Sequence, residues 1–154
     1  MAIRNILTKE DEILRKKCKP VEKFDEKLWE LLDDMAETLK EAAGVGLAAP
    51  QVGIIRRLTV IDFGEEGILD IINPVIIKKS GKQRDIEACL SCPGLAGYVT
   101  RPMKCTVKAQ DRYGKFYEKE FPAGLLSRCA CHEIDHLDGH LFLDIADEMV
   151  NTED

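Results

Sequence analysis

Length, composition and charge narrow the class of this protein before any motif is considered. The chain has 154 residues, enough for a sizeable core, and we expect residues 1–154 to form one domain. Its net charge of −6 argues against a nucleic-acid groove, which needs clustered Lys and Arg. No apolar run suits a membrane span, and the N-terminal stretch MAIRNILTKEDEILRKK does not resemble a signal or transit peptide. We therefore expect a cytoplasmic protein whose six cysteines are thiols or metal ligands rather than disulfides.

The first half of the chain contains one long predicted helix and two predicted strands. From Asp25 to Ala43, leucines and a methionine recur at helical spacing, with Asp25 as N-cap and Gly44 after the end. Residues 57–63 and 70–79 have the apolar, β-branched composition of strands. Pro74 favours an edge position or a bulge for the second strand.

The second half of the chain predicts a hairpin and a final helix. Residues 104–121 are typical of two antiparallel strands that turn at Asp111 to Gly114. A helix is expected from about residue 123 to residue 137, ending at Gly139. The sequence thus predicts an α+β fold, in which antiparallel β-sheets pack around the C-terminal helix and a long helix lies near the N-terminus.

The stretch HEIDH, at residues 132–136, lies on that final predicted helix. His132 and His136 are one helical turn apart on one face, so their imidazole nitrogens can bind a single metal ion. Glu133 projects beside this pair, where a carboxylate suits a general base better than a third ligand. The alternative is an ordinary surface helix with polar residues, so a further ligand must be sought elsewhere.

Residues near HEIDH do not supply that ligand convincingly. The extended pattern HExxHxxGxxH of some metallopeptidases fits at Gly139 but fails at its last position, which is Phe142. His140 is predicted to lie on the surface beyond the helix end. Cys129 lies on the helix face of the first histidine but about 10 Å along the axis from His136, so one ion cannot easily bind both.

A cysteine pair in EACLSCPG, residues 87–94, offers a ligand from another segment. Either Cys89 or Cys92 could close a tetrahedral site beside a Pro-Gly turn. The same pair could instead be half of a structural zinc site with Cys131 and His132, or two buried thiols. The C-x-x-C spacing alone does not decide between these alternatives.

The stretch GVGLAAPQVG, residues 44–53, combines closely spaced glycines with a single amide side chain, Gln51. Glycines let a backbone approach a ligand closely, and an amide N–H can donate a hydrogen bond to a developing oxyanion. The alternative is a plain helix C-cap followed by a turn.

Taken together, GVGLAAPQ at 44–51, EACLS at 87–91 and HEIDH at 132–136 resemble the three ordered motifs of the peptide deformylase family, over nearly the whole chain. The resemblance implies that one catalytic divalent metal is bound by Cys89, His132 and His136. Fe²⁺ is the usual ion of the family, with Zn²⁺, Ni²⁺ or Co²⁺ as alternatives. The other cysteines near these motifs are implied not to be ligands: Cys92, Cys129 and Cys131. Two departures are a shorter C-terminus than in some relatives and Ala88, where glycine is expected.

The implied reaction removes the formyl group from the N-terminal formylmethionine of newly made polypeptides and releases formate. Glu133 is expected to be the general base, and Gln51 and the backbone N–H of Leu90 resemble the family's oxyanion donors. Candidates for an apolar slot around the methionine side chain are Val45, Gly46, Leu125 and Cys129. Expected partners are formylmethionyl peptides, nascent chains and, as the family implies, the ribosome. The alternatives are an HExxH zinc peptidase and a non-enzymatic structural zinc module.

Three charged residues are further candidates near the site. We predict that Glu87 and Arg101 pair and hold the Cys89 loop in place, the alternative being two unconnected surface charges. Arg128 lies one helical turn before His132. Its stem is predicted to line the slot while its guanidinium reaches solvent at the mouth and favours acidic peptides, the alternative being a solvated arginine on the outer helix edge.

Overall fold

The structure is a computed structural model that describes residues 2–151. In this part of the chain the helices are α1 (Glu26–Glu41) and α2 (Leu125–Leu137), with short 3-10 helices η1 (Glu12–Arg15), η2 (Ala49–Val52), η3 (Gly64–Glu66) and η4 (Phe142–Asp144). The strands are β1 (Gly46–Ala48), β2 (Leu58–Asp62), β3 (Ile68–Ser80), β4 (Gln83–Ala88), β5 (Leu95–Arg101), β6 (Lys104–Gln110), β7 (Phe116–Phe121) and β8 (Glu148–Asn151).

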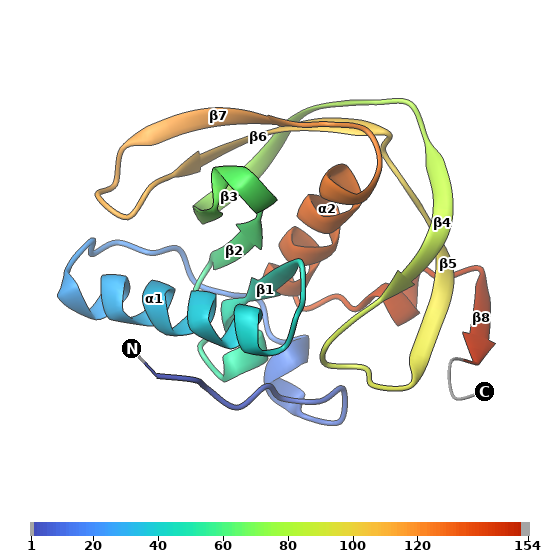
Figure 1. Cartoon of the computed structure of the whole chain (residues 1–154), viewed down its shortest axis with the longest axis horizontal. Coiled ribbons are helices and arrows are strands. Elements are labelled where there is room, and N and C mark those ends of the chain that lie inside the picture. Colours follow the sequence, from blue (N-terminus) through green and yellow to red (C-terminus); the bar gives the residue numbers. More distant parts are fainter. Residues whose placement is uncertain (1, 152–154) are drawn as a thin grey trace.

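These strands form two antiparallel sheets around α2. The larger sheet has the order β1-β2-β3-β6-β7, and the smaller has the order β4-β5-β8. Helix α2 lies between the sheets, where it contacts β1, β2 and β7 of the larger sheet and β5 of the smaller one (Figure 1). The arrangement confirms the predicted α+β class, with antiparallel sheets packed around the C-terminal helix.

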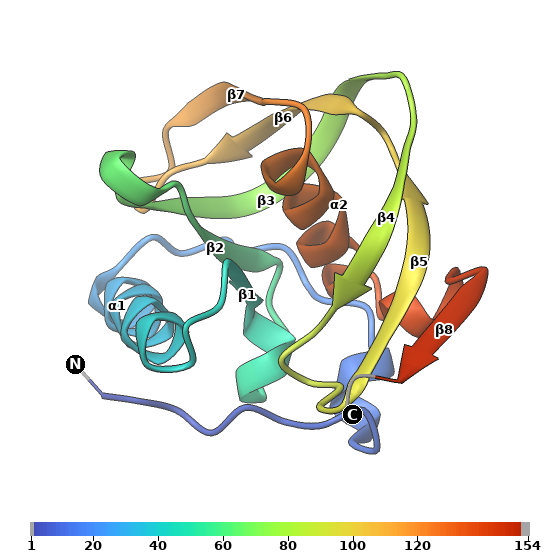
Figure 2. The ribbon, with the colours of Figure 1, turned by 45° about the vertical axis from the view of Figure 1, so that its right-hand side comes forward.

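Around β2 the larger sheet is buried on both of its faces, because successive residues of this strand are buried. On β2, Val60 joins the core cluster beneath α1, whereas the next residue, Ile61, joins the cluster beneath α2. Successive side chains of a strand point to opposite faces, so this alternation places the two helices on opposite sides of the sheet (Figure 2). Helix α1 begins where predicted, since the Asp25 side chain accepts a hydrogen bond from the Leu28 N–H.

The predicted strand at 70–79 is part of a longer strand, β3, in the middle of the larger sheet. Pro74 therefore does not mark an edge; the register with β6 shifts between Ile72 and Val75, as expected for a bulge. Asn73 has a φ of 53° at this shift. Its side chain exchanges hydrogen bonds with the backbone N–H and C=O of Val21, at 2.8 and 2.9 Å, which hold the irregular backbone in place.

Helix α2 is buried along most of its length, which explains why it can carry an internal site. It starts at Leu125, two residues later than expected, and ends at Leu137 before Gly139, which has a φ of 81°. A Cβ at Gly139 would lie 2.5 Å from the Arg15 carbonyl oxygen, so both conformation and space require glycine there. His140, just beyond the helix, is exposed as predicted. No helix within residues 2–151 has the length and apolar character needed to cross a membrane.

Candidate metal centre

Three possible metal ligands meet where β4 ends beside α2. Cys89 follows β4 directly, and His132 and His136 lie one turn apart on α2. One ligand atom from each residue lies within 4.8 Å of the other two, and the Cys89 Sγ is 3.3 Å from the His136 Nε2. One sulfur and two imidazole nitrogens suit a divalent transition metal and leave a coordination position open for water or substrate.

The protonation chemistry of the three side chains fits a metal. Burial lowers the pKa of His136 to about 3, which keeps its imidazole neutral, as a ligand must be. A hydrogen bond with the Cys92 thiol, together with burial, raises the pKa of Cys89, so a thiolate there needs a cation beside it. Among the described residues, the buried side-chain nitrogen and oxygen atoms without a hydrogen-bond partner are His136 Nδ1 and Glu133 Oε1, both in residues of this centre.

Glu87 orients His132 from the other side of its ring. The His132 Nδ1 lies 2.6 Å from the Glu87 Oε2. Burial would raise the pKa of Glu87, but its hydrogen bonds with His132 and Arg101 outweigh burial and lower the pKa to about 2. The carboxylate is therefore ionised and can only accept, so Nδ1 donates and Nε2 is left for a metal. The same hydrogen bond raises the pKa of His132 against the effect of burial.

The predicted pair of Glu87 and Arg101 is present. The Arg101 Nε and Nη2 donate to the two oxygens of the Glu87 carboxylate at 3.1 and 2.7 Å, and both side chains are buried. Sequence reasoning missed a third partner, because the Arg101 Nη1 also donates to the Asp135 Oδ2 at 2.5 Å. The spacing of HEIDH could have indicated this contact, since Asp135 lies on the helical face next to His132.

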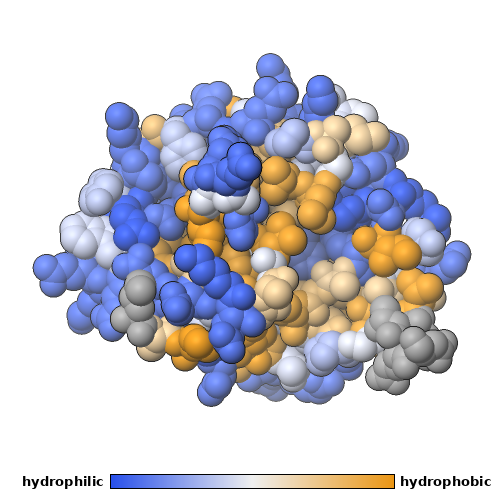
Figure 3. Space-filling model, in the orientation of Figure 1, coloured by the Kyte–Doolittle hydropathy of each residue, from blue (hydrophilic) through white to orange (hydrophobic). Residues whose placement is uncertain are grey.

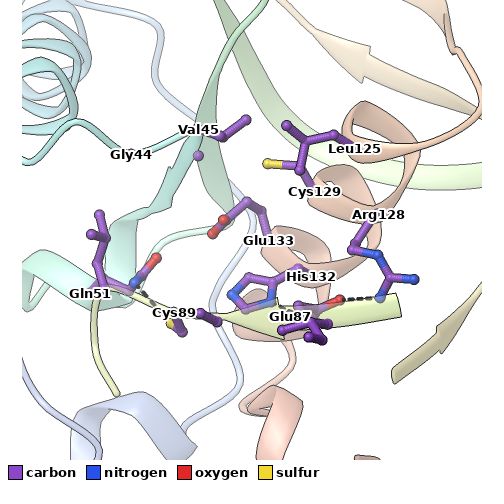
Figure 4. A pocket seen from close by; sticks show the side chains of 14 residues that line it. Gly44, Val45, Gln51, Glu87, Cys89, Leu125, Arg128, Cys129, His132 and Glu133 are labelled. Atoms are coloured by element: carbon purple, nitrogen blue, oxygen red, sulfur yellow. Dashed lines mark hydrogen bonds and ion pairs between the residues drawn. The ribbon is translucent and has the colours of Figure 1, made fainter. Parts of the chain in front are cut away.

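Glu133 projects from α2 into the space beside the ligands (Figure 4). Its side chain is buried, and burial raises its pKa to about 7. Gly46 of β1 lies against it, since a Cβ at this position would be 2.8 Å from the Glu133 Oε2. A carboxyl group with a pKa near neutrality can both accept and return a proton.

Gln51 lies in η2 on the opposite side of the centre, where its amide is held at both ends. The Oε1 accepts a hydrogen bond from the Ala48 N–H at 2.9 Å. The Nε2 donates to the Ser91 Oγ at 3.1 Å and points at the Cys89 Sγ, 3.6 Å away. Ser91 was not anticipated from the sequence. The contacts fix which end of the amide faces the centre, so a donor is directed toward the ligands.

A pocket of about 290 Å³ opens beside these groups. It is lined by the predicted slot residues and their neighbours: Gly44, Val45, Gly46, Gln51, Ile86, Glu87, Ala88, Cys89, Leu90, Leu125, Arg128, Cys129, His132 and Glu133. Leu125 and Ile86 are 62% and 48% exposed and form an apolar mouth. Figure 3 shows apolar side chains gathered over the middle of this face, within a mostly hydrophilic surface.

The prediction that the Arg128 guanidinium points to solvent is wrong. Its side chain is only 6% exposed, and the guanidinium turns inward rather than to solvent at the mouth or at an outer helix edge. The Nη1 donates to the Glu87 Oε1 and to the Val99 carbonyl, each at 2.9 Å, and the Nη2 donates to the Gln83 carbonyl at 3.3 Å. A buried carboxylate attracts the guanidinium inward, and helical spacing alone could not reveal that carboxylate.

The remaining cysteines lie outside the ligand group. All six cysteines are free thiols within the described chain. Cys92 packs in a small apolar cluster, and Cys131 packs with Cys105 in the core beneath α2. Cys129 lines the pocket instead. The group that could hold a metal contains none of them, so the structural zinc alternative with Cys92 and Cys131 is not favoured.

An HExxH helix, a possible third ligand directly after a distant strand and an adjacent apolar pocket are the features of a metal-dependent hydrolase. Residues 3–152 match the family model described as polypeptide deformylase, and the chain belongs to the peptide deformylase family. It is 55% identical over 154 residues to the peptide deformylase of Caldicellulosiruptor bescii, covering 100% of this chain and 92% of that one. The relative from Alkaliphilus metalliredigens is 54% identical over 94% of this chain and 97% of its own.

Solved structures agree with this assignment. The peptide deformylase of Legionella pneumophila has a TM-score of 0.91 at 49% identity, covering 95% of this chain and 87% of that one. That of Thermotoga maritima has a TM-score of 0.91 at 39% identity, covering 96% and 99%. The protein is thus a metal-dependent hydrolase that removes the N-formyl group from N-terminal formylmethionine and releases formate. The peptidase and structural zinc alternatives are not favoured.

Proposed function

We propose that Cys89, His132 and His136 hold the divalent metal of this hydrolase, with ferrous iron as the resident ion and zinc, nickel or cobalt as substitutes. The observation that carries the proposal is the convergence of one sulfur and two nitrogens within 4.8 Å. A bound ion would act as a Lewis acid and make water nucleophilic at neutral pH. The thiolate is a soft donor, which suits iron and zinc better than calcium or magnesium.

Glu133 is proposed to move the proton in the reaction. Its buried carboxyl group, with a pKa raised to about 7, would take a proton from the attacking water and give it to the departing amine. Gln51 Nε2 and the backbone N–H of Leu90 are proposed to donate hydrogen bonds to the formyl oxygen as it becomes negative. Support for the first donor comes from the contacts that fix the Gln51 amide beside Cys89.

The pocket is proposed to take the methionine side chain. Val45, Gly46, Leu125 and Cys129 line it and supply apolar surface, which an unbranched thioether side chain fills readily. Its natural occupants would be the N-termini of nascent chains in the cytoplasm, and the enzyme would act during protein biosynthesis, docked on the ribosome. We also propose that residues 1–154 form a single catalytic domain.

The test is formate release from formyl-Met-Ala-Ser by protein purified without oxygen, with metal analysis on the same sample. Glu133→Ala should retain nearly all of its metal while its turnover falls by at least about 10². Loss of the metal together with the activity would instead place Glu133 among the ligands and refute its role as base.

The ligand assignment is tested by comparing cysteines. Cys89→Ser should lose the metal or bind it much more weakly, whereas Cys92→Ser and Cys129→Ser should keep it and lose mainly packing. If Cys129→Ser strips the metal and Cys89→Ser does not, the proposed ligand set is wrong. Peroxide should inactivate the iron form faster than a zinc-loaded form, because iron and its thiolate are redox-active.

A further inference from the structure

The proposed ligands belong to two separate elements, so the spacing between these elements sets the geometry of the metal site. Cys89 follows the edge strand β4, whereas His132 and His136 lie on α2. No backbone hydrogen bond of a sheet ladder can hold a helix against a strand edge. Side chains that reach from α2 to the smaller sheet therefore help to fix this distance.

Arg128 makes such a connection. It lies four residues before His132, so its side chain leaves α2 one turn away on nearly the same face. Its guanidinium donates to the Glu87 carboxylate and Gln83 carbonyl of β4 and to the Val99 carbonyl of β5. One planar group thus joins the helix to both strands, and Figure 4 shows it bonded to Glu87 beside His132.

The Glu87 carboxylate shows how this connection reaches the metal ligand. Its Oε1 accepts from Arg101 at 3.1 Å and from Arg128 at 2.9 Å. Its Oε2 accepts from Arg101 at 2.7 Å and from His132 at 2.6 Å. A carboxylate has about four acceptor sites, so every site is used and the group cannot turn without losing a hydrogen bond. Its orientation in turn fixes the ring of His132.

The charges around Glu87 are balanced only when Arg128 is included; Glu87, Arg101 and Arg128 are buried, and Asp135 is 33% exposed. Glu87 and Asp135 contribute two carboxylates, and Arg101 and Arg128 contribute two guanidinium groups. Arg101 belongs to β5 and holds Glu87 within the same sheet, and it reaches α2 through the partly exposed Asp135. Without Arg128, the carboxylate would keep His132 as its one partner on α2 and would lose a cation in a buried environment.

We propose that Arg128 is a positioning residue of the metal centre, which acts through Glu87 to orient His132 and to space α2 from the strand that leads to Cys89. The proposal rests on the metal ligands proposed above. It assigns the Arg128 guanidinium no contact with the peptide, in contrast to the sequence prediction of a cation at the pocket mouth.

The test measures zinc affinity by competition with a chelator, using purified protein from which metal has been removed. Arg128→Met should raise the zinc dissociation constant about 10- to 100-fold, the usual effect of losing a group that orients a metal ligand. The matched control is Arg84→Met on the same strand, since Arg84 pairs with Asp147 and is 46% exposed. The control should change the dissociation constant by less than about twofold.

Two further measurements separate positioning from other roles. Combined with Glu87→Gln, Arg128→Met should add little further loss of zinc affinity, because both act on His132 through the same carboxylate. With zinc at saturation, the KM for formyl-Met-Ala-Asp and formyl-Met-Ala-Lys should change equally and by less than about twofold, because the guanidinium does not face the peptide.

Several results would overturn the inference. Unchanged zinc affinity with lower thermal stability would show a merely structural role, and additive losses in the double variant would show that Arg128 acts independently of Glu87. A KM change that depends on peptide charge would make Arg128 a substrate contact. If Arg128→Met does not fold, the Arg128→Lys variant decides, because one ammonium group cannot make all the hydrogen bonds of the guanidinium. A zinc affinity of Arg128→Lys equal to that of wild type would refute the proposal. If Cys89→Ser binds zinc as tightly as wild type does, the proposed metal ligands themselves are wrong.

Discussion

Gly46 lies where the backbone of the larger sheet passes close to the proposed base, Glu133. A Cβ at this position would lie 2.7 Å from the Cys129 Sγ and 2.8 Å from the Glu133 Oε2. Both neighbours are buried in the pocket wall and have little room to move aside. Because Gly46 has no side chain, the backbone of β1 can approach Glu133 closely.

Replacing Gly46 with alanine should displace Glu133 rather than unfold the protein. We expect Gly46→Ala to lower the kcat for formyl-Met-Ala-Ser by up to about 10², because small displacements of a reacting group are costly. Steady-state kinetics on metal-saturated protein measure this effect. Gly64→Ala is the control, since its Cβ would meet nothing within 4 Å, although its φ of 72° strains any side chain. The control should lose stability but keep its kcat; equal losses of kcat in both variants would contradict the prediction.

At the residue scale, the sequence predicted what helical spacing can show. The closeness of His132 to His136, and of Glu133 to both, follows from the period of the helix. Contacts between distant segments are different. Ser91 beside Gln51 depends on how the segment after β4 packs against η2, and the inward turn of Arg128 depends on how β4 packs against α2. The family resemblance supplied Cys89, which the C-x-x-C spacing alone had left open.

At the scale of elements, the bulge in β3 depends on Asn73. This residue adopts a left-handed conformation and donates and accepts three hydrogen bonds, two with Val21 and one with Gln110. Asn73→Ala should lower the free energy of unfolding by about 2 to 4 kcal/mol, from lost hydrogen bonds and from strain. Asn73→Gly should cost about 1 kcal/mol less, because glycine accepts a positive φ. Urea unfolding measures both; equal losses would show that strain at this position is negligible.

The strands that the sequence did not predict are β1, β4, β5 and β8; β5 is mostly buried, but Ala96 and Gly97 interrupt its apolar pattern. The strand β4 has the sequence QRDIEA, in which Glu87 is the one buried residue, and it is held by pairing with β5 rather than by its own composition. The strands β1 and β8 span only three and four residues. Long apolar strands and both α-helices were predicted, because tertiary pairing was not needed to recognise them.

At the scale of the whole molecule, a metal that joins α2 to the end of β4 should stabilise the fold. Above the zinc dissociation constant, each tenfold rise in free zinc should raise the free energy of unfolding by about 1.4 kcal/mol. Thermal or urea unfolding at buffered zinc concentrations measures this slope, and a chelator should abolish the gain. Cys89→Ser should show a much smaller slope; a slope equal to that of wild type would place the zinc elsewhere.

The N-terminal segment is tied to α1 by Asp34, and this contact predicts a pH dependence. The Asp34 carboxylate accepts hydrogen bonds from the Ala2 N–H at 2.7 Å and from the Arg4 guanidinium at 3.0 and 2.8 Å. Burial raises the pKa of Asp34, but these hydrogen bonds outweigh it and leave the pKa lowered. The stability from this ionised group is therefore fully present above the ordinary Asp pKa of about 3.9, and it is lost as the pH falls through the lowered value.

Asp34→Asn should accordingly be less stable than wild type by about 1 to 3 kcal/mol at neutral pH. The difference should shrink as the pH falls below about 4, because Asp34 becomes neutral first in the unfolded chain and then, at its lowered pKa, in the folded protein. Chemical unfolding at several pH values measures it. Asp33→Asn is the control, since Asp33 is 39% exposed and its pair with Arg112 should contribute less. A difference that does not depend on pH would show that charge at Asp34 is unimportant.

The position of α2 between the two sheets has a consequence for synthesis of the protein. The larger sheet is complete at Phe121, but the helix that covers its inner face and the strand β8 that closes the smaller sheet follow over the next 30 residues, to Asn151. Translation at about 5 to 20 residues per second leaves that face open for roughly 2 to 6 s. During this interval Ile61, Ile71 and Val107 lack the helix that buries them. A growing chain should therefore be most prone to aggregate, and most in need of a chaperone, just before His132 and His136, the two proposed histidine ligands, emerge.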